Sequence, residues 1–313
     1  MGSGLAVVTG SAGFIGRMLV TALAERGPVV AVDRVPHEAP PGVETITADL
    51  LDADPDVRAA LAEASVVHHL AGCPDVRDAR PDADQHRYRD NVLATSAVLA
   101  AVPMSTALLV ASSSSVYGGS RDGRPSAEHH RLRPRGGYAR SKVMVEQLCA
   151  ARAEAGGQVA VVRPFTVAGE GQRPGMALSR WIAAARDGDP LRIFGSPRRS
   201  RDLTDVRQAV QGLVELGELA RAGVSIGTVN LGTGHPLELG DIVTAIGRAL
   251  GVPVRTVVEP AADVEVAHTL ADVTRLRGLL GWSPHTDIDA LVARQIAHTP
   301  AAPVAPVALM PAS

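Results

Sequence analysis

Short apolar runs alternate with amphipathic stretches along the first half of the chain. The runs have the length of buried strands, and they cover residues 5–8, 29–32, 43–47, 65–72 and 107–111. Between them, apolar residues recur at helical spacing, as in residues 17–26 and in a stretch that opens at Asn91. Strands that alternate with helices predict an α/β fold built on a Rossmann-type, doubly wound parallel sheet.

Glycines mark the point where the first predicted strand gives way to the first helix. Gly10 permits a tight turn, Gly13 lets a pyrophosphate approach the backbone, and Gly16 lets the helix pack closely on the strand. The helix N-terminus, with Phe14 and Ile15, then faces the phosphates. This order predicts a dinucleotide site, although the spacing G-x-x-G-x-x-G differs from the simplest fingerprint.

The second strand ends in Asp33, where a carboxylate accepts hydrogen bonds from an adenosine ribose. The same charge would repel a 2′-phosphate, so Asp33 favours NAD over NADP. Arg34 weakens that preference, since a guanidinium can reach a phosphate. Asp49 with Leu50 follows the third strand and the segment 70–72 ends the fourth, and these strand ends would flank the adenine and the phosphates.

Two adjacent histidines, His68 and His69, lie in the fourth strand. Neighbouring strand residues point to opposite faces of a sheet, so this pair cannot chelate one metal ion. We expect histidines of the core or of the strand end.

A serine cluster and a tyrosine–lysine pair suggest a site for ligand binding and acid–base catalysis. Residues 112–115 are four serines that leave the end of an apolar strand, where open α/β sheets bind ligands. Tyr138 and Lys142 are four apart, and therefore share one helix face. An ammonium beside a phenol favours the phenolate, so we expect Lys142 to lower the pKa of Tyr138 and make it a general base.

Composition and charge limit the classes of partner and the cellular compartment that we expect. The 313 residues carry a formal net charge of −2, which gives no bulk electrostatic reason to expect nucleic acid or a membrane. No apolar run approaches the roughly 18 residues of a bilayer span, and no signal peptide is visible. Cys73 and Cys149 have no metal-ligand spacing and imply no disulfide framework, so the sequence predicts no metal site and a reducing cytoplasm.

Taken together, these segments resemble the extended short-chain dehydrogenases/reductases, in their NAD-dependent nucleotide-sugar epimerase/dehydratase family. The matching motifs stand in the family's order, at residues 9–16, Asp33, 49–50, 69–72, Asn91, 112–118, Tyr138 with Lys142, and 163–167.

The resemblance implies NAD as cofactor and assigns the catalytic roles to Ser113, Tyr138 and Lys142. Besides Tyr138 and Lys142, the implied cofactor-binding residues are Gly10, Gly13, Phe14, Ile15, Gly16, Asp33, Arg34, Asp49, Leu50, Leu70, Ala71, Gly72, Asn91, Ser112 and Pro164.

The two residues after Ser113 narrow the reaction. Dehydratases of the family carry an Asp-Glu pair there, and decarboxylases that make UDP-xylose carry a Glu at the second position. This chain has Ser114 and Ser115 instead. It therefore has the equipment to move a hydride but lacks the usual carboxylates for dehydration or decarboxylation.

Residues 71–77 and 165–177 are similar to segments of UDP-glucuronate 4-epimerases. That resemblance implies that Ser114, Ser115 and Thr166 receive the sugar carboxylate through charge-assisted hydrogen bonds. A neutral hexose or a deoxysugar would also fit these hydroxyls. The implied substrate-binding residues are Arg77, Ser113, Ser114, Ser115, Thr166, Arg173, Arg192 and Arg201.

The implied activity is 4-epimerisation of a UDP-sugar, by oxidation at C4, rotation of the 4-keto sugar and re-reduction. A one-way NDP-4-keto-sugar reductase with the same residues stays open, as does a non-catalytic NAD-sensing protein. The family's diphosphate-binding Arg is absent before Asp263, so Arg201 would bind the diphosphate, with Arg198, Arg199 or Arg207 as alternatives. The nucleotide also stays open.

The expected organisation follows the resemblance. It comprises an NAD-binding domain at 1–163 with a returning segment near 203–230, a smaller C-terminal α/β substrate lobe at 164–298, and a frayed tail at 299–313. The resemblance also implies a homodimer, in which the helix after Asn91 and the helix of Tyr138 and Lys142 form a four-helix bundle with the partner.

Overall fold

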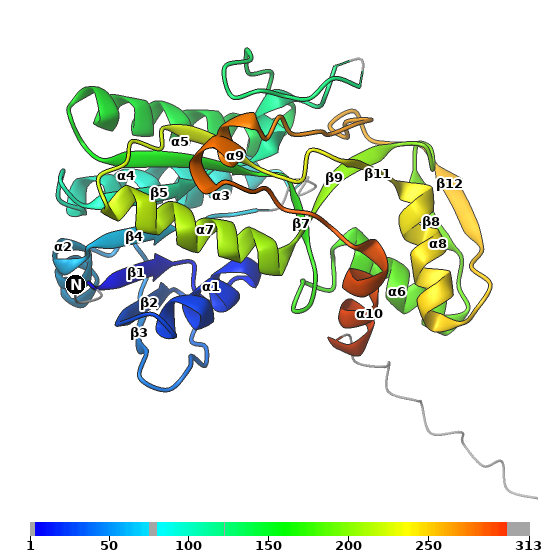
Figure 1. Cartoon of the computed structure of the whole chain (residues 1–313), viewed down its shortest axis with the longest axis horizontal. Coiled ribbons are helices and arrows are strands. Elements are labelled where there is room, and N and C mark those ends of the chain that lie inside the picture. The colour runs from blue at the N-terminus through cyan, green and yellow to red at the C-terminus, as the bar shows by residue number, and fades with distance from the viewer. Residues whose placement is uncertain (1–3, 75–79, 122, 299–313) are drawn as a thin grey trace, which may run out of the picture.

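The computed structural model describes residues 4–74, 80–121 and 123–298. Its core is a seven-stranded parallel sheet with strand order β10-β6-β5-β4-β1-β2-β3 (Figure 1). The strands are β1 (Ala6–Thr9), β2 (Val29–Asp33), β3 (Glu44–Thr47), β4 (Val66–His69), β5 (Ala107–Ala111), β6 (Val159–Pro164) and β10 (Thr228–Leu231). This confirms the Rossmann-type doubly wound sheet.

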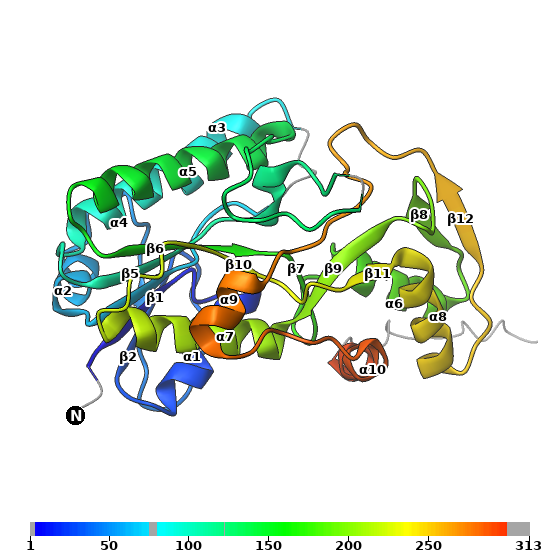
Figure 2. The ribbon, with the colours of Figure 1, turned by 45° about the horizontal axis from the view of Figure 1, so that its top comes forward.

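Helices cover both faces of this sheet. Figure 2 shows α5 on one side and α7 with α1 on the other. Val8 packs into the core cluster under α1 and α7, whereas its neighbour Val7 packs into the cluster under α2, α4 and α5, because successive strand residues face opposite ways. These helices are α1 (Phe14–Ala24), α2 (Pro55–Glu63), α4 (Ala94–Ala101), α5 (Gly136–Glu154) and α7 (Val206–Arg221).

One helix differs from its prediction. Asn91 does not open a helix; it lies inside a π-helical turn, Tyr88–Leu93, between α3 (Ala83–Arg87) and α4. The wider π turn inserts one extra residue into the helix and is frequent at functional sites. Here it places the buried Asn91 side chain against the segment after β4.

The second lobe is smaller. It contains a three-stranded sheet in the order β11-β9-β7 and a parallel β8–β12 ribbon, packed with α6, α8 and α10 around a third core cluster. The elements are β7 (Thr166–Ala168), α6 (Ala177–Asp187), β8 (Leu191–Phe194), β9 (Ser200–Asp205), β11 (Pro236–Glu238), α8 (Leu239–Leu250), β12 (Thr256–Glu259) and α10 (Ile288–His298). A short helix, α9 (Thr274–Leu280), packs on the edge strand β10 of the seven-stranded sheet and on helix α7.

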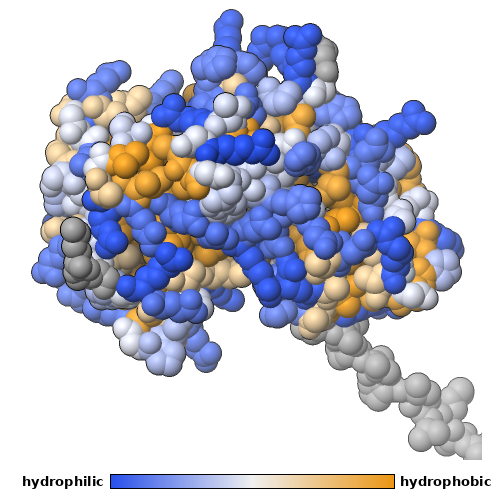
Figure 3. Space-filling view, viewed as in Figure 1, coloured by the Kyte–Doolittle hydropathy of each residue, from blue (hydrophilic) through white to orange (hydrophobic). Residues whose placement is uncertain are grey.

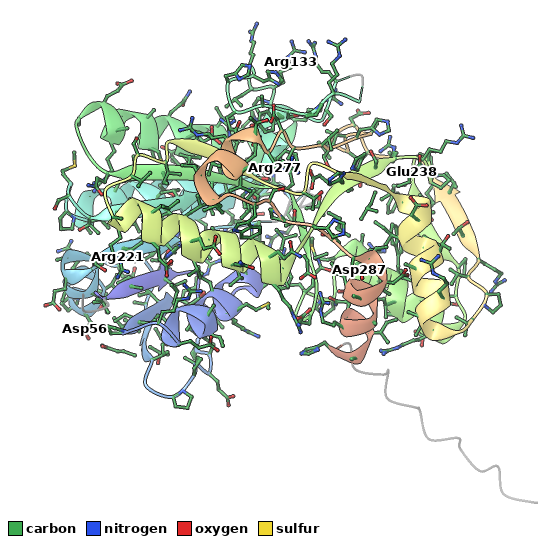
Figure 4. The ribbon with its side chains drawn as sticks, viewed as in Figure 1. Asp56, Arg133, Arg221, Glu238, Arg277 and Asp287 are labelled. Carbon is green, nitrogen blue, oxygen red and sulfur yellow. The ribbon has the colours of Figure 1, made fainter. Side chains whose placement is uncertain are left out.

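Charged side chains mostly lie at the surface. Asp56, Arg221 and Asp287, labelled in Figure 4, are all exposed. The face shown in Figure 3 is largely hydrophilic, with separate apolar patches. No helix in the described part of the chain is long and apolar enough to cross a membrane. Against this background, a few buried charged residues stand out, and one of them, Lys142, belongs to the predicted site.

Candidate active site

The glycine turn after β1 has the close contacts that its sequence predicts. Gly10 has a φ of +76°, and a Cβ there would lie 2.5 Å from the backbone nitrogen of Ala71. A Cβ on Gly16 would lie 2.1 Å from the carbonyl oxygen of Gly10. Side chains are therefore excluded at both positions, and β1, the turn and α1 pack as closely as a dinucleotide fold requires.

The N-terminus of α1 offers an anion site. Gly13 is the N-cap, no side chain caps this helix in the described structure, and its first turn holds no acidic residue. Amide groups at a helix N-terminus bind phosphate, and Phe14 and Ile15 supply the first of them. The cradle therefore fits the pyrophosphate of NAD.

Acidic and basic groups lie beside this cradle at the ends of β2 and β3. Asp33 accepts the amide of Ala12 in the turn at 3.0 Å, so the turn itself positions this carboxylate. The Arg34 guanidinium is bound by Asp90 at 3.0 Å. Because Arg34 already has a carboxylate partner, the structure agrees with a cofactor that lacks the 2′-phosphate.

Asp49, the carboxylate that follows the third strand, is connected to Asp90 through a shared arginine. Asp49 pairs with Arg89 at 2.7 Å, and Arg89 also contacts Asp90. Burial raises the pKa of Asp49, but the hydrogen bond from the Leu51 amide and the Arg89 charge outweigh it and leave the pKa below its usual value. Asp49 is therefore ionised at neutral pH.

Asn91 connects the segment after β4 to the helix of the predicted base. Its Oδ1 accepts the amide of Cys73 at 2.8 Å, and its Nδ2 donates to Ser141 Oγ at 2.8 Å. Ser141 Oγ in turn donates to the carbonyl of Tyr138 at 2.8 Å. A Cβ on Gly72 would lie 2.4 Å from Asn91 Oδ1, so a side chain there would break this arrangement.

Both histidines of β4 are buried, as predicted, and they face opposite sides. His69 lies between Thr9 at 2.7 Å and Thr95 at 2.9 Å. Thr95 Oγ1 donates to the carbonyl of Asn91, so His69 Nε2 must donate to Thr95 and Nδ1 must accept from Thr9. Burial, and secondarily the Lys142 charge, lowers the pKa of His69 to about 3, so it stays neutral.

The predicted base and lysine lie together in α5. Tyr138 and Lys142 are 8% and 7% exposed, and the Ser113 side chain lies close enough to Tyr138 to act on its pKa. Ser113 is the N-cap of a 3₁₀ turn, Ser114–Tyr117, and its Oγ accepts the amide of Ser115 at 3.1 Å. The structure therefore brings the three predicted catalytic residues into one place.

The prediction that the pKa of Tyr138 is lowered is wrong for the protein without its cofactor, because this pKa is raised. Burial raises the pKa of Tyr138 and outweighs both its hydrogen bond with Ser113 and the nearby Arg173 charge. Burial also lowers the pKa of Lys142 to about 8. Removing water disfavours each charged form, so this cost exceeds the attraction that the sequence suggested. Lys142 still carries its charge at neutral pH, and Tyr138 holds its proton.

The predicted substrate residues divide into two groups. Ser114, Ser115 and Thr166 are half-buried, and Ser115 Oγ is a buried atom without a partner among the described residues. The charge of Arg173 acts on Tyr138, which places this arginine near the reaction centre. Pro164 ends β6, one residue before Phe165 and two before Thr166.

The other predicted arginines are less directly supported. Arg192 lies on β8, 65% exposed, and pairs with Glu259 at 3.4 Å. Arg201 on β9 donates to the carbonyl of Ala267 at 3.1 Å. Arg77 lies outside the described residues. Their roles in substrate binding stay predictions.

Two of the arginines named as alternatives for binding the diphosphate already have carboxylate partners. Arg199 lies 3.9 Å from Glu265. Arg207 pairs with the buried Glu170, which also binds Arg294 of α10 at 3.2 Å.

A buried ionic group behind the serines is absent from the residues predicted from the sequence. Glu146, one turn after Lys142 on α5, binds Arg163 of β6 and the hydroxyl of Ser112. Ser112 is a predicted cofactor residue, but its side chain donates to Glu146 and its amide donates to the carbonyl of Val162, which leaves its own carbonyl for the cofactor. The spacing of Glu146 four residues after Lys142 was the available signal, since it puts both on one helix face.

A site of this construction belongs to a Rossmann-fold enzyme that exchanges a hydride with a nicotinamide cofactor. The family model for the NAD dependent epimerase/dehydratase family matches residues 6–232. The chain belongs to this family of enzymes, and NAD is its cofactor.

Relatives and solved structures agree with this assignment. A probable UDP-glucuronate 4-epimerase of Rhizobium meliloti is 30% identical over 92% of this chain and 94% of that protein. The structure of MoeE5 in complex with UDP-glucuronic acid and NAD is 34% identical, with a TM-score of 0.84 over 95% of this chain and 99% of that one. The UDP-glucuronic acid 4-epimerase from Bacillus cereus, in complex with UDP-glucuronic acid and NAD, is 26% identical, with a TM-score of 0.86 over 94% of this chain and 98% of that one.

Proposed function

We propose that this protein is a UDP-sugar 4-epimerase and that its substrate pair is UDP-glucuronate and UDP-galacturonate. The observation that carries the proposal is that the Ser113 side chain lies near Tyr138, which shares helix α5 with Lys142. No carboxylate follows Ser113, so the loop lacks the usual acid for elimination. The similarity to UDP-glucuronate 4-epimerases over nearly the whole chain supports the choice of sugar.

Proton transfer falls to Tyr138. Bound NAD supplies the acceptor and donor of the C4 hydride. Tyr138, which holds its proton in the protein alone, would act from its phenolate form and take the proton of the sugar 4-hydroxyl, while Ser113 hydrogen-bonds the same oxygen. Lys142 supplies the positive charge that favours the phenolate. After the 4-keto sugar has turned its other face to the site, Tyr138 returns the proton.

The sugar carboxylate would be held by neutral hydroxyls. Ser114, Ser115 and Thr166 are the candidates, and Ser115 Oγ is a buried polar atom with its hydrogen-bonding capacity unused in the described structure. Hydroxyl donors bind a carboxylate by charge-assisted bonds, each stronger than a neutral one. They hold it without a buried arginine that would resist rotation of the intermediate.

The substrate test compares three sugars. The protein is incubated with UDP-glucuronate, UDP-glucose and UDP-N-acetylglucosamine, and C4 epimers are resolved by chromatography. We expect epimerisation of UDP-glucuronate without added nicotinamide. A requirement for stoichiometric NADPH would contradict epimerisation and identify the alternative, an NDP-4-keto-sugar reductase.

A variant tests the carboxylate pocket. Loss of one charge-assisted bond costs about 1.5–3 kcal/mol, or roughly 10- to 100-fold in kcat/KM. Ser115→Ala should therefore reduce kcat/KM for UDP-glucuronate by that factor while any turnover of UDP-glucose changes little. Equal losses for both sugars would argue against Ser115 as a carboxylate ligand.

The predicted homodimer also belongs to this proposal. Tyr88 and Leu93 of the π turn and Met144 of α5 are 45%, 40% and 38% exposed, and their helices pack side by side. A second copy seated on these helices would cover the three apolar side chains in a four-helix bundle. Light scattering should give a dimer mass, and Leu93→Arg should shift it to the monomer.

The remaining organisation is proposed on the same resemblance: an NAD-binding domain at 1–163, with residues 203–230 returning to it, and a substrate lobe at 164–298. Cys73 and Cys149 are free thiols, which agrees with a reducing compartment such as the cytoplasm.

A further inference from the structure

The loop that carries Ser113 is attached at both of its ends. At its start, Ser112 Oγ donates to Glu146 Oε1 at 2.5 Å. At its far end, Tyr117 Oη accepts from Arg163 Nη1 at 2.7 Å. Between these anchors lie the three serines proposed to contact the substrate, followed by the buried Val116.

One buried ion pair joins the two anchors. Arg163 Nε and Nη2 bind Glu146 Oε1 and Oε2 at 2.8 and 2.7 Å, so the pair is bidentate. The two side chains are 5% and 10% exposed. A planar guanidinium and a carboxylate in this arrangement have a fixed relative geometry. The two ends of the loop are therefore held at a fixed separation.

The far anchor continues into neighbouring segments. Tyr117 Oη donates to Asn230 Oδ1 at 2.7 Å, and Asn230 Nδ2 donates to the carbonyls of Ser126 and Asp272. The Arg163 guanidinium also lies 4.9 Å from the centre of the Tyr117 ring. The phenol of Tyr117 thus has a donor and an acceptor in fixed positions, and it cannot move without breaking both bonds.

A stabilising role alone does not explain this arrangement. Desolvating two charges costs about as much as their attraction returns, so a buried ion pair is weak evidence for stability. Its position is more informative. Glu146 lies on the same face of α5 as Tyr138 and Lys142, and it holds the residue directly before Ser113.

We propose that the Glu146–Arg163 pair, with Ser112 and Tyr117, is a clamp that sets the position of Ser113 relative to Tyr138. All four are positioning residues: they act through the loop and do not touch the reacting atoms. The clamp fixes the hydroxyl of Ser113 against the phenol from two directions, and it also aims Ser114 and Ser115. This inference rests on the proposed function for its kinetic consequence, while its structural consequence stands on the contacts alone.

Mild variants test the clamp without leaving a buried charge unpaired. Ser112→Ala removes the first anchor, Tyr117→Phe removes the second, and the double variant removes both. Thr106→Val is the matched control, because Thr106 is a buried hydroxyl that binds the Ala64 carbonyl just before β5, at the opposite end of that strand. Arg163→Lys keeps the charge but cannot form the bidentate pair.

The readouts are kcat, KM, retained NAD and hydrogen exchange of the peptide that covers residues 112–118. Small misplacements of reacting groups cost up to about 10²-fold in rate. We expect kcat to fall roughly 10- to 100-fold in each anchor variant and in Arg163→Lys, with KM and retained NAD nearly unchanged. The loop peptide should exchange faster in these variants, and Thr106→Val should change neither readout.

Three outcomes separate the possibilities. Faster loop exchange together with reduced kcat supports the clamp. Unchanged exchange in the double variant, or unchanged kcat despite faster exchange, overturns it. If the unmodified protein converts no UDP-sugar, the proposed function fails instead, and the exchange of the loop alone then decides whether the clamp exists.

Discussion

The Nζ of Lys142 lies 2.9 Å from the carbonyl oxygen of Ala111, the last residue of β5. This hydrogen bond joins α5 to the strand that leads into the serine loop. The carbonyl accepts a hydrogen bond from the ammonium, but burial has the larger effect on its titration and lowers the pKa of Lys142 to about 8.

This pKa predicts the alkaline limit of activity. The ammonium is present below pH 8 and is lost as the pH rises through the pKa, and only the charged form favours the Tyr138 phenolate. We expect kcat to fall above about pH 8. Lys142→Arg stays charged and should shift this fall to higher pH, even if its maximal rate is lower. An alkaline limb that is identical in the two proteins would assign the limit to another group.

Removal of the proposed base tests the mechanism directly. Tyr138→Phe keeps the ring but loses the proton carrier, so kcat should fall by about 10²- to 10⁴-fold. The ring still fills its buried position, and bound NAD should be retained. Tyr88→Phe is the control, because Tyr88 is 45% exposed in the π turn. Undiminished turnover of Tyr138→Phe would refute the role of the base.

The glycine turn permits a paired test of cofactor binding. Gly16→Ala puts a Cβ 2.1 Å from the Gly10 carbonyl oxygen, where backbone must move, so we expect loss of NAD measured by mass spectrometry. Gly278→Ala is the matched change in α9, where an added Cβ meets nothing within 4 Å. It should bind NAD normally and gain up to about 1 kcal/mol of stability. Normal NAD content in Gly16→Ala would contradict the role of this turn.

Buried His68 predicts a loss of stability in acid. Burial lowers its pKa to about 4 from the unfolded value of 6.5, so the unfolded chain binds the proton more readily between these values. The contribution of neutral His68 is fully present above pH 6.5 and is lost progressively as the pH falls towards 4. From pH 6.5 to 5 this amounts to about 2 kcal/mol.

Urea unfolding at several pH values measures this effect. His68→Leu should unfold with a shallower pH dependence than the unmodified protein, because one titrating group has been removed. Burial lowers the pKa of His69 as well, to about 3, so this ring contributes to the slope that remains. An identical slope in His68→Leu would show that this ring does not titrate on unfolding.

Much of the fold was determined by local sequence. Apolar runs of strand length and the glycines after the first of them required only short-range patterns, because strand burial and a backbone φ of +76° at Gly10 leave few other residues acceptable. The order of motifs carries the family resemblance, which predicts the catalytic roles of Ser113, Tyr138 and Lys142. The boundaries of the predicted strands agree with the observed ones to within a few residues.

Tertiary structure alone decided what depends on distant partners. Asn91 lies inside a π turn and its side chain bridges Cys73 and Ser141, contacts that no local pattern records. The pKa of Tyr138 rises because burial outweighs nearby charge, and burial is a property of the assembled fold. The Glu146–Arg163 pair forms only when α5 and β6 meet. The sequence by itself thus predicts which residues carry the chemistry, while packing decided their protonation and their positions, because desolvation and hydrogen-bond geometry arise only when separate segments are brought together.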